Sequence, residues 1–282
     1  MNVAVILNFM NFRQTIDCAQ NLIGKLDKIV IVDNDSKNES YKILKEKFVH
    51  DPMVFVIEEH LNRGYAAGNN AGLKYIEKKF GISKNTHIFI VNPDSYVESE
   101  TIANISSFID SNYKVGAVTA LINGSSKSAW HHMNKMSAFI FNSWIMRWIL
   151  MHFKIREGGM YAVGNEHYTK VDVVMGAFFG IRQDVFKEVG YFDEGTFLYY
   201  EEEALYVKLN KKEYSNFLLT DESFKHVGRT STALSKLSFK KINDNSRMYV
   251  LKKYYNAGSI YIGTLRMINK VDNLLLKILH RG

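Results

Sequence analysis

Amide and acidic side chains stand where several short apolar segments of the chain end. Asn8 and Phe9 follow the first segment, Asp33 follows the second, and Asn92 and Asp94 follow the fourth. Each of these polar residues also favours turns, so any one of them taken alone can be explained as a turn residue with no role in binding. Three polar ends together instead predict a ligand site, because open α/β sheets bind ligands at the carboxyl ends of their strands.

Three consecutive glutamates, Glu201, Glu202 and Glu203, follow the aromatic stretch Phe197–Tyr200. At a solvated helix start they would only complement the helix dipole. Beside tyrosine and phenylalanine, one of them can instead be partly desolvated, which raises its proton affinity toward that of a general base.

A glycine-containing loop, Asn62–Gly72, precedes a predicted helix. Its glycines permit close backbone approach, and a helix N-terminus favours an anion. The loop can also be only a tight connection. Neither a glycine-rich dinucleotide fingerprint nor a Walker sequence follows the first apolar segment.

The elements that must position these residues alternate between strands and helices. Short runs rich in Val, Ile and Phe predict strands at Val3–Leu7, Lys28–Asp33, Met53–Ile57, His87–Val91, Val115–Ile122 and Val173–Arg182. Segments with one apolar face predict helices at Thr15–Leu26, Ser40–Phe48, Ala66–Phe80 and Ser99–Ile109. This order predicts an α/β chain with a doubly wound, mostly parallel sheet.

Composition narrows the class of protein. The 282 residues suffice for one large α/β domain or one domain with an appendage. The one cysteine, Cys18, excludes an intramolecular disulfide and a cysteine zinc cluster, so we expect a reducing cytosol. We expect no signal peptide and no membrane-spanning helix. The net charge of +7 favours an anionic partner, whether nucleic acid, nucleotide or acidic membrane.

Five segments in the same order resemble the inverting family 2 glycosyltransferases, over roughly residues 3–255. They are Ile6–Cys18, Val32–Ser36, Asn62–Asn70, Val91–Asp94, and Gly176–Arg182 with Val189–Glu194. The resemblance implies a GT-A fold with a Rossmann-like central sheet and a helical C-terminal extension. It divides the chain into a transferase domain (1–255) and an extension (256–282). Within the domain, residues 1–122 form the nucleotide-sugar half and 123–255 the acceptor half.

The resemblance also implies roles for individual residues. Asp33 would recognise a pyrimidine base, in a pocket walled by Asn8, Phe9 and Arg63. Asp94 and His226 would hold a Mg²⁺ or Mn²⁺ ion bridging the diphosphate, and hard cations of this kind suit an oxygen ligand. The remaining nucleotide-sugar residues that it implies are Gly64, Asn92, Arg229 and Arg247.

The catalytic base follows from the family's Tyr-Glu-Asp-x-Asp-Leu sequence, which resembles Tyr200–Leu205 here. Position for position, Glu202 stands where the family has the aspartate that acts as the catalytic base. Ala204 stands where the family motif has its second aspartate. Glu201 and Glu203 stay open as alternatives to Glu202.

The implied function is transfer of a sugar from a UDP-hexose or dTDP-rhamnose to a hydroxyl of a glycan or lipid-linked acceptor, in bacterial surface polysaccharide synthesis. An inactive nucleotide-sugar-binding or scaffolding subunit is the alternative, prompted by the altered Glu-Glu-Glu-Ala segment. Nucleotidyl transfer would need a glycine- and lysine-rich phosphate loop near the first strand, which the sequence lacks. Nucleic-acid binding rests only on net charge, and we do not expect it.

Two apolar segments have alternative interpretations. In the C-terminal segment, Leu265, Ile268, Val271, Leu275 and Ile278 predict an amphipathic helix. It would pack on the domain or on a second subunit of a homo-oligomer, or else bind an anionic membrane from the cytoplasmic side. The Trp144–Phe153 stretch predicts either a core helix or a second interfacial contact.

Overall fold

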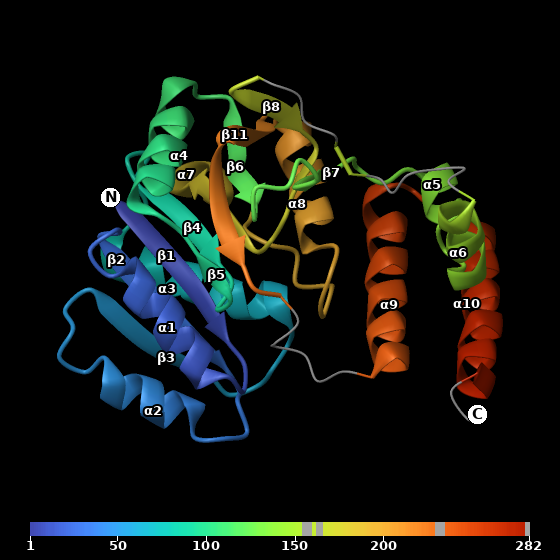
Figure 1. Ribbon diagram of the computed structural model, residues 1–282, viewed down its shortest axis with the longest axis horizontal. Coiled ribbons are helices and arrows are strands. Elements are labelled where there is room, and N and C mark those ends of the chain that lie inside the picture. Colours follow the sequence, from blue (N-terminus) through green and yellow to red (C-terminus); the bar gives the residue numbers. More distant parts are fainter. Residues whose placement is uncertain (154–159, 162–165, 229–234, 280–282) are drawn as a thin grey trace.

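The computed structural model describes residues 1–153, 160–161, 166–228 and 235–279. Its centre is a twisted sheet in which β8 also pairs with β11 (Figure 1). The strands of this sheet, in spatial order, are β3 (Val54–Glu59), β2 (Lys28–Asn34), β1 (Asn2–Asn8), β4 (His87–Val91), β10 (Phe178–Arg182), β6 (Val115–Ile122), β11 (Ser215–His226) and β5 (Ser95–Tyr96), with β8 (Tyr168–Val171) beside β11. A small second sheet pairs β7 (Ala129–Trp130) with β9 (Val173–Val174).

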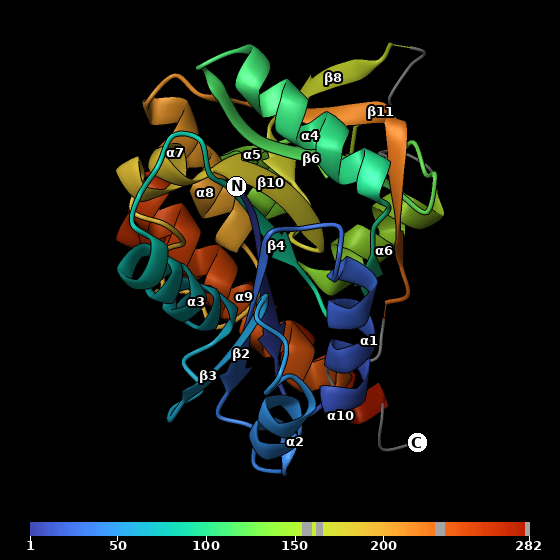
Figure 2. The same ribbon diagram turned by 90° about the vertical axis from the view of Figure 1, so that its left-hand side faces the viewer.

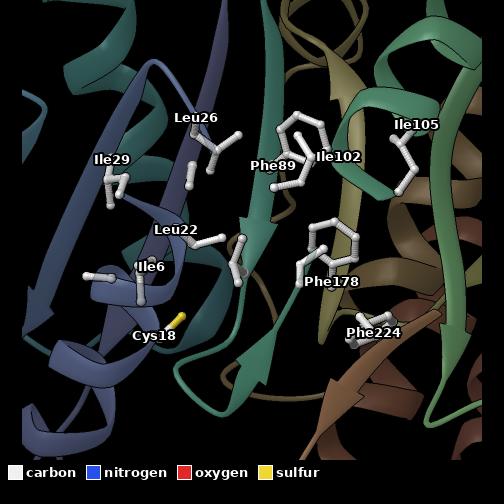
Figure 3. Packing of buried hydrophobic residues seen from close by; sticks show 14 of the residues in the cluster. Ile6, Cys18, Leu22, Leu26, Ile29, Phe89, Ile102, Ile105, Phe178 and Phe224 are labelled. Carbon is white, nitrogen blue, oxygen red and sulfur yellow. The ribbon is translucent and has the colours of Figure 1, made fainter. Parts of the chain in front are cut away.

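Helices cover both faces of the large sheet, which is why its strands are nearly continuous apolar runs. One face packs on α1 (Phe12–Leu22), α2 (Ser40–Lys47) and α4 (Ser99–Ser111). The other packs on α3 (Tyr65–Phe80), α7 (Gln183–Glu188) and α8 (Glu201–Lys211). Figure 2 shows α1 and α4 on the side of the sheet opposite α3, and Figure 3 shows the core on the α1 side.

Alternate residues of each strand enter opposite cores. Ile6 and Phe89 point toward α1 and α4, whereas Val5 and Ile90 belong to the cluster under α3. This period of two is what a strand buried on both faces requires. The expected mostly parallel α/β sheet is confirmed: β1 to β4 are parallel to one another, β11 is parallel to β6, and β10 is antiparallel to β4 and β6.

Two expected elements differ from the structure. The first helix is Phe12–Leu22 rather than Thr15–Leu26, because Asn11 caps its start and Gly24, at a φ of 81°, lies in the turn that follows it. The expected strand Val173–Arg182 is two strands, β9 and β10, with a break at residues 175–177. At this break the Ala177 carbonyl accepts bonds from the Asn92 amide and the Ser95 hydroxyl, both at 2.9 Å, so the chain turns toward the end of β4.

A layer of helices packs beside the sheet. It consists of α5 (Lys135–Ile140), α6 (Trp144–His152), α9 (Lys236–Tyr254) and α10 (Ser259–Leu279). In Figure 1, α9 lies between the sheet and α10, and α5 and α6 lie along α10. The domain boundary that we expect after residue 255 falls in the turn between α9 and α10, and this division stays a prediction. In the part of the chain described, none of the helices combines the length and apolarity that crossing a bilayer requires.

Candidate active site

A buried amide–carboxylate pair joins the ends of β1 and β2. Asn8 Nδ2 donates to Asp33 Oδ2 over 2.6 Å, and Thr15 donates its hydroxyl to Asn8 Oδ1 over 2.7 Å. The Ser36 amide donates to the second Asp33 oxygen over 2.9 Å. Both Asn8 and Asp33 are buried, so their orientations are fixed by neighbours rather than by solvent.

Phe9 lies directly beside this pair, and 41% of its surface is exposed. The next residue, Met10, has a φ of 61° and donates its amide to Ser36 Oγ over 2.8 Å. The turn therefore leaves an aromatic face open at the sheet edge, where a planar ring can stack on it.

The glycine-containing loop contacts the segment that leads into α8. Gly64 has a φ of 99°, and a Cβ there would lie 2.1 Å from the Phe197 carbonyl oxygen. The Tyr65 amide donates to the same oxygen over 2.8 Å. Arg63 forms ion pairs with Glu194 at 2.8 Å and with Glu59 at 3.8 Å. The loop before α3 and the segment before α8 are thus held together at the N-terminus of α3.

Tyr65 lies at the centre of the site, and our sequence reasoning missed it. Its hydroxyl is 2.8 Å from the Gly176 carbonyl oxygen and 3.1 Å from Asn92 Oδ1. Burial raises the pKa of Tyr65 well above its usual value, and the charges of Glu202, Glu201 and Asp94 raise it further. Tyr65 is therefore a neutral donor. Its place within the glycine-containing loop is the only signal in the sequence that would have pointed to it.

Asp94 and His226 form a pair at the open edge of the sheet. His226 ends β11, which pairs with β5 so that His226 faces Ser95, and its Nε2 lies 3.2 Å from Asp94 Oδ2. The Gly228 amide also donates to this oxygen over 3.1 Å. Burial alone would raise the pKa of Asp94, but the hydrogen bond and charge of His226 and the backbone amides outweigh it and lower that pKa.

This pair fits a divalent cation. A carboxylate oxygen and an imidazole nitrogen both suit Mn²⁺, and Mg²⁺ commonly uses one or two carboxylates together with substrate phosphates. Among the described residues, no group of three or more His, Cys, Asp or Glu side chains could hold a metal. Any ion held by Asp94 and His226 would therefore need further oxygen ligands from a bound substrate or from water.

The three consecutive glutamates have three different environments. Glu203 is buried and accepts hydrogen bonds from the Met133 amide at 2.9 Å and from the Tyr255 hydroxyl. Glu201 is also buried, and its Oε1 has no hydrogen-bond partner within the described residues. Glu202 is partly exposed and fills the space beside Gly176, where a Cβ would lie 1.8 Å from Glu202 Oε1.

Burial raises the pKa of each of these carboxyl groups. The charge of Glu203 raises the pKa of Glu202 further, and the charge of Glu202 does the same for Glu201. The two residues before α8, Tyr199 and Tyr200, have φ values of 72° and 71°. Left-handed backbone at residues other than glycine stores strain, and such strain is concentrated at functional sites.

One expected arginine, Arg247, is not part of this arrangement. Arg247 is buried in the helical layer, where it donates to Asn142 Oδ1 at 2.5 Å and to Asp244 Oδ1 at 2.7 Å. Its charge is neutralised there by Asp244, so we correct its assignment from nucleotide binding to a structural ion pair. Arg229 lies outside the described residues.

A cavity of about 620 Å³ lies elsewhere, at the amino-terminal ends of β1 and β4. Its polar lining is internally paired: His87 Nε2 lies 2.9 Å from Asp110, and Arg182 Nε lies 2.6 Å from Asp184. Because parallel sheets bind ligands at the opposite strand ends, the candidate active site is the edge with Asp94 and Glu202.

Comparison with known proteins identifies the family of the chain. The sequence profile of glycosyl transferase family 2 matches residues 10–190. A low-salt glycan biosynthesis hexosyltransferase, Agl10 of Haloferax volcanii, is 27% identical over 202 residues, covering 70% of this chain and 58% of the relative. The rhamnosyltransferase WbbL of Escherichia coli K12 is 24% identical over 149 residues, covering 52% of this chain and 54% of the relative. The matches thus span somewhat over half the length of these relatives.

Solved structures with the GT-A fold superpose on most of the chain. GalNAc-T7 with UDP, GalNAc and Mn²⁺ has a TM-score of 0.64 at 14% identity, covering 91% of this chain and 49% of that one. The mannosyltransferase PcManGT of Pyrobaculum calidifontis, with GDP-Man and Mn²⁺, has a TM-score of 0.56 at 13% identity, covering 97% and 80%. These likenesses show the fold, and the profile match shows the family: the chain belongs to glycosyl transferase family 2.

Proposed function

We propose that this protein is an inverting glycosyltransferase that uses a nucleotide-diphosphate sugar and a divalent cation. The observation that carries the proposal is a set of contacts around Tyr65, whose hydroxyl lies 2.8 Å from the Gly176 carbonyl oxygen and 3.1 Å from Asn92 Oδ1. Glu202 fills the space beside Gly176, and Asn92 is two residues before Asp94 in the chain. Family membership and the names of the two relatives, a hexosyltransferase and a rhamnosyltransferase, support it. The donor is a UDP-hexose or dTDP-rhamnose, and the acceptor is a hydroxyl of a glycan or lipid-linked oligosaccharide in surface polysaccharide synthesis.

The donor occupies the carboxyl ends of β1, β2 and β4. Asp33, oriented by Asn8, accepts a hydrogen bond from the N–H group of a pyrimidine base, and Phe9 contacts the ring face. Arg63 and Gly64 line the sugar–phosphate side of the pocket. Asp94 and His226 would hold Mg²⁺ or Mn²⁺, and such an ion would supply positive charge to neutralise a departing diphosphate.

Glu202 is the base in this proposal. Its carboxylate accepts the proton of the acceptor hydroxyl while that oxygen bonds to the anomeric carbon, and the carbon–oxygen bond to the diphosphate breaks on the opposite side. Its raised pKa makes it a stronger proton acceptor than an ordinary glutamate. The bonds that Glu203 accepts from Met133 and Tyr255 suit a structural role, and the burial of Glu201 keeps that carboxyl away from an acceptor.

A screen of nucleotide sugars tests the proposal before any acceptor is known. Thermal shift and donor hydrolysis are measured with Mn²⁺ and with EDTA, for the parent protein and for Glu202→Gln. We expect one donor to stabilise both proteins and to be hydrolysed by the parent alone. Binding without hydrolysis or transfer by the parent would favour the inactive, nucleotide-sugar-binding alternative.

The site of action stays a prediction. We propose a cytoplasmic reaction, peripheral to the membrane, since the lone buried cysteine suits a reducing compartment and a lipid-linked acceptor would lie at the membrane surface.

A further inference from the structure

Helix α10 has a second apolar face, on the side away from α9. Ile262, Leu265 and Leu276 are buried against the helical layer. A separate set of large apolar side chains on α10 is exposed, by 53–89% of their surface: Ile260, Met267, Val271, Leu274 and Ile278. At 3.6 residues per turn these five lie within about 60° of one another around the helix axis. We call them the α10 stripe.

This arrangement differs from the single apolar face that we expected. The sequence pattern places Val271 and Ile278 on one stripe with Leu265, yet they are exposed while Leu265 is buried. The buried face instead includes Asp272, which accepts a bond from the Ser143 hydroxyl at 3.1 Å and lies 3.9 Å from Lys240. The inner face of α10 therefore contains paired polar side chains, and the residues of the α10 stripe lie on its outer, exposed face.

The same pairing removes negative charge from the surface of the layer. In the stretches 131–153 and 235–279 the only acidic residues are Asp244 and Asp272, and both are buried. Asp244 pairs with Lys240 at 2.6 Å and with Arg247 at 2.7 Å. The exposed charges of these helices are therefore all positive.

Several of these positive charges flank the α10 stripe. Arg266, Lys270 and Lys277 are exposed and lie on one side of it, about 70–110° around the axis from its centre. Lys135 on α5 and Arg147 on α6 are exposed as well. An apolar strip bordered by basic side chains is the arrangement by which interfacial helices bind anionic lipid.

Helix α6 also exposes apolar side chains. The two residues before it contact α10: the Asn142 side chain donates to the Leu265 carbonyl over 3.2 Å, and the Ser143 hydroxyl donates to Asp272 over 3.1 Å. Ile145, Met146 and Trp148 on α6 are 37–54% exposed. Tryptophan in particular favours the boundary between lipid and water.

We propose that the α10 stripe and the exposed side of α6 dock this protein on a membrane that contains anionic phospholipid. A second copy of the chain fits this surface less well. A symmetric dimer would bring two basic edges together, and the described part of the layer has no exposed acidic residue to pair with them.

The docking surface is one helix away from the candidate base. Helix α9 packs between α10 and the sheet, and next to its end the Tyr255 hydroxyl donates to Glu203, the neighbour of Glu202. Tyr254 in α9 donates to Asp193 in the segment that leads to α8. Docking would therefore hold the active site close to the lipid surface, where a lipid-linked acceptor would lie. This benefit for catalysis rests on the proposed function, whereas the docking itself does not.

Vesicle sedimentation of the whole chain tests the docking. Vesicles of phosphatidylcholine alone are compared with vesicles that also contain phosphatidylglycerol, at low and high salt. The apolar variant is Met267→Gln/Val271→Gln/Leu274→Gln, matched by Val49→Gln/Ile82→Gln/Tyr113→Gln, which changes exposed residues of the sheet part. The charge variant is Arg266→Gln/Lys270→Gln/Lys277→Gln, matched by Lys42→Gln/Lys45→Gln/Lys47→Gln on α2.

We expect the parent and both matched controls to bind only the anionic vesicles, and less at high salt. The charge variant should bind about 100-fold more weakly, given the usual contribution of each basic residue near anionic lipid, and the apolar variant should fail to sediment. Equal binding of variants and controls, or no binding by the parent, would overturn the proposal. So would a dimer of the parent that the apolar variant dissociates in the absence of vesicles. Glu202→Gln should still bind vesicles, so loss of transfer and loss of docking are separable.

Discussion

Glu202 occupies the volume that a side chain at Gly176 would need, with 1.8 Å between its Oε1 and a Cβ built at residue 176. Gly176→Ala must therefore displace the carboxylate. Because a shift of about 1 Å in a catalytic group can cost about 100-fold, we expect kcat to fall by about that factor. Donor affinity should change little, since Asn8, Asp33 and Asp94 are untouched.

Gly263→Ala is the matched control for this change. Gly263 lies in α10, and a Cβ there meets no atom within 4 Å. We expect unchanged turnover and equal or slightly higher thermal stability, since alanine favours a helix over glycine. A Gly176→Ala enzyme with parental kcat would show that the contact with Glu202 has no catalytic consequence.

Asp94→Ala should abolish metal-dependent donor binding while the fold persists. The buried side chain follows β4 and is not part of the apolar core clusters, so its removal leaves those clusters intact and takes a partner from the Gly228 amide and from His226. Nucleotide-sugar affinity is measured by titration in Mn²⁺ and in EDTA. Asp221→Ala, which removes another Asp–His pair on β11, should leave the affinity unchanged. Equal affinity of Asp94→Ala and the parent in Mn²⁺ would exclude Asp94 as a ligand.

As the pH is lowered, kcat should begin to fall at a higher pH than it would if the catalytic base were a glutamate with an ordinary pKa. Glu202 must be ionised to accept a proton, and burial raises its pKa above the usual value of about 4.3. A group whose pKa is raised on folding stabilises the folded chain at low pH, and this contribution is lost as the pH rises through the raised value. Glu202→Gln should therefore gain thermal stability over the parent between pH 5 and 8. A kcat that stays flat down to about pH 4 would contradict the assignment.

Asp193 should stabilise the segment that leads to α8. Burial raises its pKa, but the bonds from Lys253, Tyr254, the Gly195 amide and Tyr249 outweigh burial and lower the pKa to about 2. This contribution is present above the ordinary aspartate value and is lost as the pH falls toward 2. Asp193→Asn should lower the free energy of unfolding by about 2 kcal/mol at neutral pH, as measured by urea titration, by about half as much at pH 3, and by little at pH 2.

Glu98→Gln is the control for that measurement, because Glu98 forms an exposed pair with Lys25. Its effect should stay within about 0.5 kcal/mol. If the free energy of unfolding of Asp193→Asn were lower than that of the parent by the same amount at every pH, the charge of the Asp193 carboxylate would contribute nothing to stability.

Periodicity was sufficient to predict the strands at the centre of the fold. β1, β2, β4 and β6 begin and end within one residue of their expected bounds, because residues buried on both faces leave an unbroken apolar run. The break between β9 and β10 was not predictable. It depends on bonds from Asn92 and Ser95 to Ala177, which join segments more than 80 residues apart.

Only the family resemblance predicted that Asp94 and His226 lie together. The same resemblance was wrong for Arg247, which pairs with Asp244 instead of lying in the site. A basic residue in the C-terminal half gives no sign in the sequence of whether its partner is a diphosphate or a buried carboxylate such as Asp244. The three glutamates likewise look equivalent in the sequence. Their differences arise from what the fold places opposite each: Tyr255 for Glu203 and Gly176 for Glu202.

The most direct test of the account is single-turnover transfer by Glu202→Gln, compared with Glu201→Gln and Glu203→Gln. Glutamine keeps the shape and hydrogen bonding of the side chain but cannot accept the proton, so we expect the rate for Glu202→Gln to fall by about 10²–10⁴-fold with donor affinity unchanged. Glu203→Gln should lose stability rather than rate, because its carboxylate accepts the bonds from Met133 and Tyr255. Near-parental transfer by Glu202→Gln, with the loss appearing instead in Glu201→Gln or Glu203→Gln, would contradict the account.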